Sequence, residues 1–324
     1  MAGARRRPEV TSSHAATPWQ ASHVRVAIIG NFDGVHGGHQ ALVRRAREHL
    51  GGDPNGRVVA VTFDPHPAAV LRPDRSPTRL TSVDRRAALL REAGVDEVVV
   101  LRFTPEFASR RPEDFARMLR EAPAIAADAV IVGDNFRFGA QAAGDTAMLA
   151  DFGAALGFDV EVISLVSEQV PGDVDGAWSS TRIRDAIAAG DLAAASAMLG
   201  RPHRLEGTVV RGDQRGRELG YPTANVHVEA DAALPPDGVY AGRLVVAGEG
   251  LPAAVSIGTN PQFEGTRRRV EAYAIGRDDL DLYGVQVGVD LVARLRGQEV
   301  FASVDELVAQ MARDVSAAEA ALEG

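Results

Sequence analysis

Short apolar runs alternate with helical patterns through the N-terminal part of the chain. The runs are VRVAIIG, RVVAVTF, DEVVVLRF, DAVIVGD and FDVEVISLV, and each is typical of a strand buried on both faces of a parallel sheet. Between the first two runs, Leu42, Ala46 and Leu50 recur at helical spacing and form one apolar stripe. The repeated order of strand, helix and strand predicts an α/β domain with a doubly wound, Rossmann-like sheet over residues 23–202.

The hydrophobic pattern changes to a period of two near residue 203. The segments LEGTVVRG, GVYAGRLVVAG, PAAVSIG, RRVEAYAIG and YGVQVGVDLVARLR are separated by turns rich in glycine and proline. This pattern predicts an antiparallel β-barrel in a second domain, residues 203–324. The final segment carries Ser303 and Glu306 at capping-box spacing before an apolar stripe, which predicts a C-terminal helix that packs on the barrel.

The composition narrows the possible functions. Acidic residues outnumber basic ones 44 to 35, for a net charge of −9, which argues against a nucleic-acid partner. No apolar run approaches the ~20 residues of a membrane span. All 35 basic residues are arginine, so a lysine-dependent phosphate loop and Schiff-base chemistry are both excluded. A phosphate site must therefore use arginine, backbone N–H groups, helix N-termini, histidine or a metal ion.

The chain also contains no cysteine, which excludes disulfides and thiolate chemistry and fits a cytoplasmic protein. Residues 1–22 carry three consecutive arginines but no apolar core, and we interpret them as a flexible leader. We expect small-molecule partners and no membrane. The sequence leaves the oligomeric state open and is compatible with a homo-oligomer.

The segment GNFDGVHGGHQ, residues 30–40, follows the first predicted strand and opens the first predicted helix. Ligands of α/β sheets bind at such carboxyl ends of strands. The glycines let a ligand approach the backbone, and His36 and His39 lie on one helical face, where both imidazoles can bind a phosphate at the helix N-terminus. An incidental surface turn is one alternative. A zinc site is another, and it needs a third ligand such as His66 or Asp134.

Three further motifs follow in order: TFDPHP at 62–67, VGDNFRFGAQAAGD at 132–145 and SSTRIRDAIAAGDLAAASAMLGRP at 179–202. In the last of these, Ser179 or Ser180 caps a helix whose first turn brings hydroxyl, N–H and guanidinium groups toward an anion. Taken alone, it could be a plain capped helix with solvated arginines.

Together, these motifs resemble the adenylyltransferase half of the bacterial bifunctional riboflavin kinase/FAD synthetase family, with an HxGH-type nucleotidylyltransferase signature at residues 30–40. The resemblance implies ATP and phosphate contacts at Gly30, Phe32, Asp33, Gly34, His36, His39, Ser180, Thr181 and Arg184. It implies flavin contacts at Phe63, Pro65, His66, Pro67, Asp134, Asn135 and Phe138. Phe63 and Phe138 could also be core residues.

The segment GTVVRGDQRGRELGYPTANV, residues 207–226, resembles the riboflavin kinase signature of the same family. Its glycines permit a loop to close over phosphates, and Thr223 and Asn225 offer hard oxygen ligands suited to Mg²⁺. The implied ATP and phosphate contacts are Gly207, Gly212, Gly216, Arg217, Gly220, Thr223 and Asn225. By resemblance, Glu271 takes the proton of the riboflavin 5′-hydroxyl, although a partly exposed strand glutamate would show the same pattern.

The resemblance therefore implies a transferase that uses ATP twice, with Mg²⁺ as a cofactor. Riboflavin becomes FMN at the barrel, and FMN becomes FAD with release of pyrophosphate at the parallel sheet, where His36 and His39 stabilise charge. Two alternatives remain open. One is a nucleotidylyltransferase for another phosphorylated acceptor, such as phosphopantetheine, and the other is a flavin-binding protein without turnover.

Overall fold

A computed structural model describes residues 24–164, 179–212, 216, 219–259 and 268–323, so the predicted leader lies outside the described residues. The N-terminal domain contains a parallel sheet in the order β3-β2-β1-β4-β5. The strands are β1 (Arg25–Ile29), β2 (Arg57–Asp64), β3 (Glu97–Arg102), β4 (Ala129–Gly133) and β5 (Asp159–Ile163). The predicted Rossmann-like sheet is confirmed.

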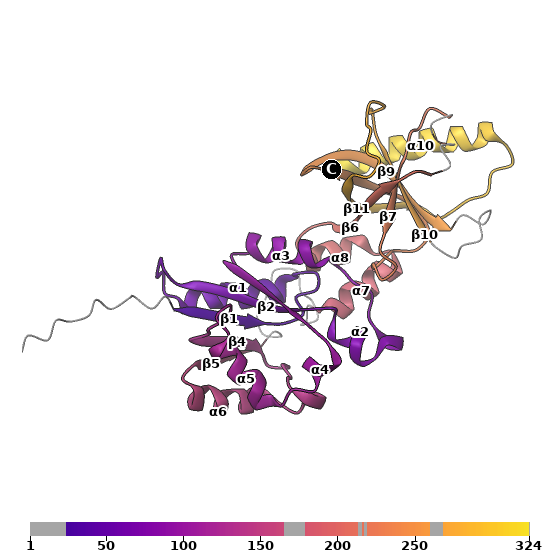
Figure 1. The fold of residues 1–324 in the computed structure, drawn as a ribbon. Coiled ribbons are helices and arrows are strands. Elements are labelled where there is room, and N and C mark those ends of the chain that lie inside the picture. The colour runs from indigo at the N-terminus through magenta and orange to yellow at the C-terminus, as the bar shows by residue number, and fades with distance from the viewer. Residues whose placement is uncertain (1–23, 165–178, 213–215, 217–218, 260–267, 324) are drawn as a thin grey trace, which may run out of the picture.

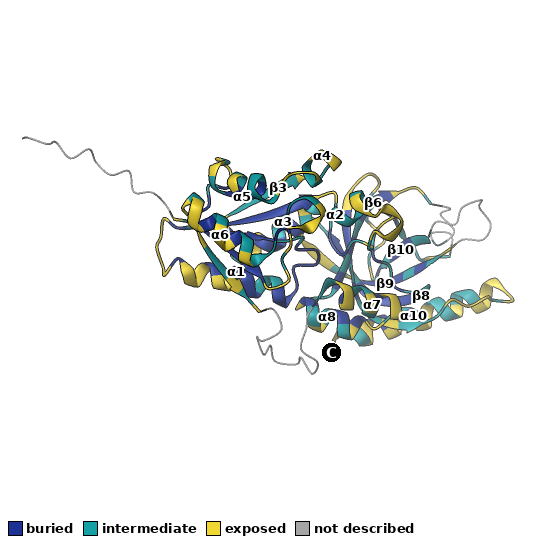
Figure 2. Ribbon diagram, turned by 90° about the horizontal axis from the view of Figure 1, so that it is seen from below, coloured by how far each residue is buried: buried dark blue, intermediate teal, exposed yellow. Residues whose placement is uncertain are grey.

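Helices cover both faces of this sheet (Figure 1). They are α1 (Gly37–His49), α2 (Pro67–Leu71), α3 (Val83–Glu92), α4 (Pro105–Ala108), α5 (Pro112–Glu121) and α6 (Thr146–Leu156), with short 3₁₀ turns η1 (Pro73–Arg75) and η2 (Ala140–Ala142). Successive residues of β1 point to opposite faces. Ile28 packs with Leu42 and Leu90 of α1 and α3, whereas Ala27 packs on the other side with Phe115 of α5. The central strands β1, β2 and β4 are buried, and the outer faces of the helices are yellow in Figure 2.

The C-terminal domain is a closed antiparallel barrel in the order β10-β7-β6-β11-β8-β9. Its strands are β6 (His203–Val210), β7 (Ala224–Val228), β8 (Gly238–Val246), β9 (Glu249–Thr259), β10 (Arg268–Ala274) and β11 (Gln286–Arg296). The final helix, α10 (Val304–Glu323), lies against β8, β9 and β11. The Ser303 hydroxyl accepts the N–H of Glu306 at 3.2 Å, as the capping pattern predicts. The barrel and the C-terminal helix are therefore both confirmed.

Helices α7 (Ser180–Ala189) and α8 (Leu192–Leu199) lie between the sheet and the barrel (Figure 1). Leu192 of α8 belongs to the apolar cluster that fills the barrel, and α8 contacts β6 and β11. On the other side, Leu199 packs with Leu80 of the N-terminal domain and Ala233 of the barrel. The domain boundary at residue 202 stays a prediction, because the barrel buries side chains that precede it.

Candidate functional site

The sequence-predicted phosphate site lies where β1 and β4 end side by side in the sheet. The chain connects β1 to β2 on one side and β4 to β5 on the other, so this is the switch point of the strand order, where α/β sheets bind ligands. The segment that contains Gly30 and Phe32 follows β1 and leads into α1, while Asp134 and Asn135 follow β4 and are exposed. The structure thus brings the HxGH-type segment and the beginning of the third motif to one edge.

His36 and His39 form a stacked pair at the N-terminus of α1. His36 is the N-cap residue, and the two ring centroids are 3.7 Å apart with 24° between the planes. His36 is only 3% exposed. The Nδ1 atom of each ring is buried without a hydrogen-bond partner among the described residues. Unpaired buried polar atoms cost about 1–3 kcal/mol each, so a partner outside the described residues would stabilise these two nitrogens.

The pair is uncharged at neutral pH. Burial lowers the pKa of His36 to about 4, although the negative charge of Asp33 opposes this shift. Burial also lowers the pKa of His39 well below its usual value, and the nearby His36 and Arg86 lower it further. Each neutral imidazole carries one N–H donor and one acceptor nitrogen. The rings can therefore donate to phosphate oxygens, without adding formal charge, beside the partial positive charge of the α1 N-terminus.

The zinc alternative finds no support around this pair. Within the part of the chain that the structure describes, no group of three or more histidine, aspartate or glutamate side chains could hold a metal ion. His66 and Asp134 are therefore not gathered with the pair into a three-ligand site there. A tetrahedral zinc site needs more protein ligands than two imidazoles supply.

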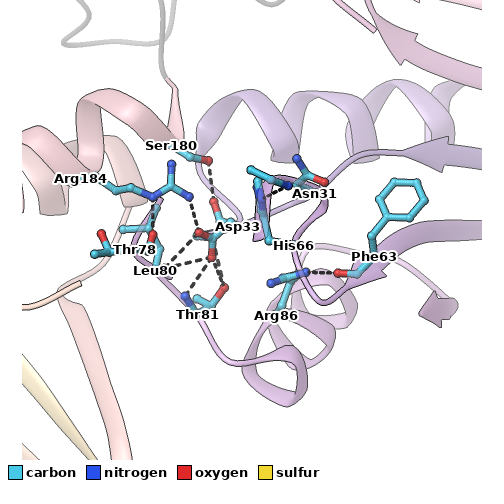
Figure 3. Close-up of polar contacts among 12 residues, drawn as sticks. Asn31, Asp33, Phe63, His66, Thr78, Leu80, Thr81, Arg86, Ser180 and Arg184 are labelled. Carbon is cyan, nitrogen blue, oxygen red and sulfur yellow. Dashed lines mark hydrogen bonds and ion pairs between the residues drawn. The ribbon is translucent and has the colours of Figure 1, made fainter. Parts of the chain in front are cut away.

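Asp33 makes several polar contacts that hold the loop before α1 in place, as Figure 3 shows. Its carboxylate is 2% exposed and accepts the backbone N–H groups of Leu80 and Thr81 at 3.0–3.1 Å, together with the Thr81 hydroxyl. It also forms an ion pair of 2.5 Å with Arg184 of α7. Because these donors occupy the carboxylate, Asp33 shapes the phosphate loop in this structure.

The start of α7 also contacts Asp33. Ser179 is the capping residue, since its hydroxyl accepts the N–H of Arg182 at 3.3 Å. Ser180 instead donates its hydroxyl to the backbone carbonyl of Asp33 at 2.8 Å. Arg184 also donates to the carbonyl of Thr78 at 2.5 Å. Thr181 is exposed. The motif SSTRIR thus lies beside the histidine loop, and its role in binding phosphate stays a prediction.

Besides Asp134 and Asn135 after β4, the residues implied as flavin contacts fall into two groups. His66, Pro65 and Pro67 surround the start of α2, where His66 Nδ1 accepts the N–H of Ala68 at 3.1 Å and the ring lies on the side of Asp33 (Figure 3). Phe63 and Phe138 instead belong to the apolar cluster beneath the sheet, and the Phe63 ring points away from Asp33 and Ser180. In this structure the two rings are core residues, and their contact with flavin stays a prediction.

Buried polar groups complete the site, and the sequence did not indicate them. Arg86 of α3 is 2% exposed and donates to the Thr62 hydroxyl and the Phe63 carbonyl. Arg201 donates to the Gly34 carbonyl at 2.5 Å, and burial lowers its pKa to about 10. Each lies in a stretch with other arginines and looks like part of a solvated face. Only the fold reveals that they point inward.

On the barrel, the second predicted site gathers around β7 and β10. Asn225 and Glu271 are directly opposite each other in the antiparallel ladder. Their neighbours Val226 and Val270 are buried in the barrel, so the Asn225 and Glu271 side chains share its outer face, with Cβ atoms about 5 Å apart. A Cβ atom on Gly212 would lie 2.4 Å from the Asn225 amide, so only glycine permits this close approach.

Other members of the predicted kinase site lie around this pair. A Cβ on Gly216 would meet the Tyr221 carbonyl at 2.4 Å and the Thr223 hydroxyl at 3.6 Å, which places Thr223 against the glycine-rich turn. Gly220 has a φ of +84°. Gly207 lies in β6 opposite Val228. Arg217 lies outside the described residues.

Comparison with known proteins identifies both halves of the chain. The FAD synthetase family model matches residues 19–172, and the riboflavin kinase family model matches residues 199–322. The chain is 39% identical to the bifunctional riboflavin kinase/FMN adenylyltransferase of Escherichia coli K12, an alignment that covers 89% of this chain and 90% of that protein. It is 33% identical to the enzyme of the same name from Listeria monocytogenes, with 90% of each chain covered.

A solved structure has the same fold over nearly the whole length. A Streptococcus pneumoniae protein named as a macrolide-efflux protein superimposes with a TM-score of 0.78 and 31% identity, covering 92% of this chain and 94% of that one. The name macrolide-efflux protein refers to the Streptococcus pneumoniae protein and assigns no efflux activity to this chain. Among the helices described here, none has the length and apolar character required to span a membrane.

Proposed function

The chain belongs to the bifunctional riboflavin kinase/FMN adenylyltransferase family, and from that membership we propose which residues carry each of its two reactions. It is a transferase with both activities. The barrel transfers the γ-phosphoryl group of ATP to the 5′-hydroxyl of riboflavin, which gives FMN and ADP. The parallel-sheet domain joins FMN to the adenylyl group of a second ATP, which gives FAD and pyrophosphate.

For the second reaction, we assign charge stabilisation to His36 and His39. A phosphate oxygen of FMN attacks the α-phosphorus of ATP, and the bond from that phosphorus to the pyrophosphate oxygen breaks. The nucleophile is already ionised, so the protein needs only to align the two phosphates and stabilise the developing charge. The observation that carries this assignment is the stacked pair of imidazoles at the N-terminus of α1, each with a buried Nδ1 atom.

The remaining adenylyltransferase residues have supporting roles in this proposal. Arg184 and Ser180 hold α7 against the phosphate loop through Asp33, and the exposed Thr181 faces a ligand at the first turn of α7. Asp134 and Asn135, at the exposed end of β4, contact the nucleotide or flavin, and the His66 loop holds the flavin from the other side.

For the first reaction, we assign the general base to Glu271, which removes the proton of the riboflavin hydroxyl as that oxygen attacks the γ-phosphorus. Asn225, directly opposite, and Thr223 offer neutral oxygen ligands, a donor set that fits Mg²⁺. When bound, this ion neutralises phosphate charge. Gly212 and Gly216 allow the loop to lie against these side chains.

The proposed partners are small molecules, and the proposed location is the cytoplasm. A net charge of −9 argues against a nucleic-acid partner. A chain without cysteine suits a reducing compartment. The proposal is also compatible with a homo-oligomer. The riboflavin kinase match over residues 199–322 argues against a nucleotidylyltransferase for another acceptor.

The test compares His39→Ala with His49→Ala in the full-length protein. His49 lies at the other end of α1, near Glu161 on the surface, and serves as the matched control. With FMN, ATP and Mg²⁺, we expect His39→Ala to lower FAD formation by about 10²- to 10³-fold, as for loss of one charge-stabilising donor. FMN formation from riboflavin should stay unchanged. Unchanged FAD formation would overturn the role of His39, and absence of both activities in the wild-type protein would overturn the proposed function.

A further inference from the structure

Arg86 is a buried cation beneath the adenylyltransferase site, and the mechanism above does not use it. It lies in the first turns of α3 and is 2% exposed. Its Nη1 atom donates to the Thr62 hydroxyl at 3.2 Å and to the Phe63 carbonyl at 3.1 Å. The Thr62 hydroxyl in turn donates to the carbonyl of Asn31 at 3.1 Å. One guanidinium thus ties the end of β2 to the first residues after β1.

The charge of Arg86 is only partly compensated. Among the described residues, none forms an ion pair with it, and its Nε atom is buried without a hydrogen-bond partner there. Burial lowers the pKa of Arg86, while the negative charges of Asp33 and Asp64 oppose that shift. Asp33 is already paired with Arg184. A buried charge without a partner is costly, several kcal/mol in proteins, so its position calls for an explanation.

The position of Arg86 relative to the histidine pair supplies that explanation. The Asn31 carbonyl, which Arg86 reaches through Thr62, belongs to the loop that leads into the histidine pair. Burial and His36 lower the pKa of His39, and the positive charge of Arg86 lowers it further. In Figure 3 one guanidinium nitrogen reaches the Phe63 carbonyl, while another points toward the side of Asp33 and His66. The ends of β1 and β2 and the N-terminus of α1 meet here. An anionic ligand at this edge would supply the negative charge that Arg86 lacks.

We propose that Arg86 is a positioning residue for FAD formation, which holds the ends of β1 and β2 beneath the histidine pair and attracts the substrate phosphates with a buried positive charge. This proposal rests on the proposed adenylyltransferase function. Arg86 acts through Thr62, Asn31 and the backbone of Phe63. Its charge reaches the phosphates over a distance through a poorly polarisable interior, where fixed charges are weakly screened.

The test uses the full-length protein with Arg86→Gln, Arg86→Lys and Thr62→Val, and takes Arg91→Gln as the matched control. Arg91 is another arginine of α3, and its side chain is exposed. We expect Arg86→Gln to lower kcat/KM for FAD formation by about 10²-fold, the lower end for loss of one preorganised charged donor. Arg86→Lys, which keeps the charge, should recover most of this loss. Arg91→Gln should stay within about threefold of wild type, because substitutions of exposed side chains away from a site have small effects.

A pH profile separates the electrostatic role from a purely structural one. The charged and titratable groups that act on the histidine pair are Asp33, Arg86, Arg184 and Arg201, besides the two rings themselves. Removing the Arg86 charge makes His39 easier to protonate, so its pKa rises. The acid limb of kcat/KM for FAD formation should therefore move to higher pH in Arg86→Gln and stay in place in Arg86→Lys.

Riboflavin phosphorylation by the same protein is the internal control and should change by less than about twofold, because the barrel does not contain Arg86. Pyrophosphate binding, measured by calorimetry, gives a second readout that is independent of turnover, and Arg86→Gln should weaken it by about tenfold. If the wild-type protein formed no FAD, the proposed function would fail, while pyrophosphate binding would still decide the role of Arg86.

Three results would overturn the proposal for Arg86. One is FAD formation within threefold of wild type in Arg86→Gln, and another is equal loss in Arg86→Gln and Arg86→Lys with no shift of the acid limb. If Arg86→Gln does not fold, Thr62→Val decides, because it removes the hydroxyl that links Arg86 to Asn31 and keeps the charge. An unchanged kcat for FAD formation in Thr62→Val would then exclude the positioning role.

Discussion

Replacing Asp33 with asparagine tests whether this carboxylate holds the phosphate loop together. The substitution keeps the size of the side chain but removes its charge. Arg184, whose side chain is 13% exposed, would lose its ion-pair partner at 2.5 Å. An NH₂ group would also face the N–H groups of Leu80 and Thr81, or leave one of them without an acceptor.

The structure sets the size of the effect. Breaking a buried ion pair by removing one partner costs about 3–5 kcal/mol, because the other charge stays buried. In a domain of roughly 150–250 residues, each kcal/mol lowers the melting temperature by about 2–4 °C. We therefore expect Asp33→Asn to lower the melting temperature of the N-terminal domain by roughly 6–20 °C. FAD formation should fall as well, since Asp33 fixes the turn before His36.

Thermal unfolding of the full-length protein, followed by circular dichroism, measures this change. Glu97→Gln is the matched control, because Glu97 is paired with Arg25 but is 45% exposed. Exposed pairs contribute about 0–1 kcal/mol, so this variant should melt within about 3 °C of wild type. The double variant Asp33→Asn/Arg184→Gln should lose less than the sum of the two single variants. Equal melting temperatures for Asp33→Asn and Glu97→Gln would refute the reasoning.

Two further predictions concern the barrel. Glu271→Gln should lower FMN formation by about 10²- to 10⁴-fold and leave the conversion of supplied FMN to FAD unchanged, because a positioned general base contributes that much; a change of only a few fold in coupled ADP release would contradict it. A fragment of residues 190–324 should have a free energy of unfolding, measured by urea denaturation, about 2–5 kcal/mol higher than that of a fragment of residues 203–324. The shorter fragment lacks Leu192, which packs in the barrel core. Equal urea midpoints would show that α8 does not stabilise the barrel.

The sequence predicted the two-domain fold because each domain has its own hydrophobic period. Runs buried on both faces marked the parallel strands, and alternation marked the barrel strands. The pattern could not assign α8 to a domain. Leu192, Ala195 and Leu199 form an apolar stripe, but Leu192 packs in the barrel, whereas the other two belong to a cluster that contains Leu80 of the N-terminal domain and Ala233 of the barrel. An apolar stripe predicts that one face of a helix is buried, but it does not predict which domain that face packs against.

The candidate site was predictable where one short segment carries the geometry. His36 and His39 come together because they are three residues apart at a helix start, and Ser179 caps α7 locally. Contacts between distant segments were not predictable. Asp33 and Arg184 bind each other across 151 residues of sequence, while their predicted contact with phosphate stays a prediction. Phe63 could equally be a core or a flavin residue, and only its surroundings distinguish these roles.

Contacts between the two domains were likewise not predictable from the sequence. The segment of residues 79–82 bonds to both domains. Its Leu80 and Thr81 N–H groups bind Asp33. Its Arg79 N–H donates to the Asp231 carbonyl of the barrel at 2.6 Å, and the Ser82 hydroxyl donates to Glu206 of β6 at 2.5 Å. Because these bonds share four consecutive residues, a large rotation of the barrel must either break them or move the Asp33 turn. The phosphate loop and the barrel are therefore mechanically connected, although each domain has its own core.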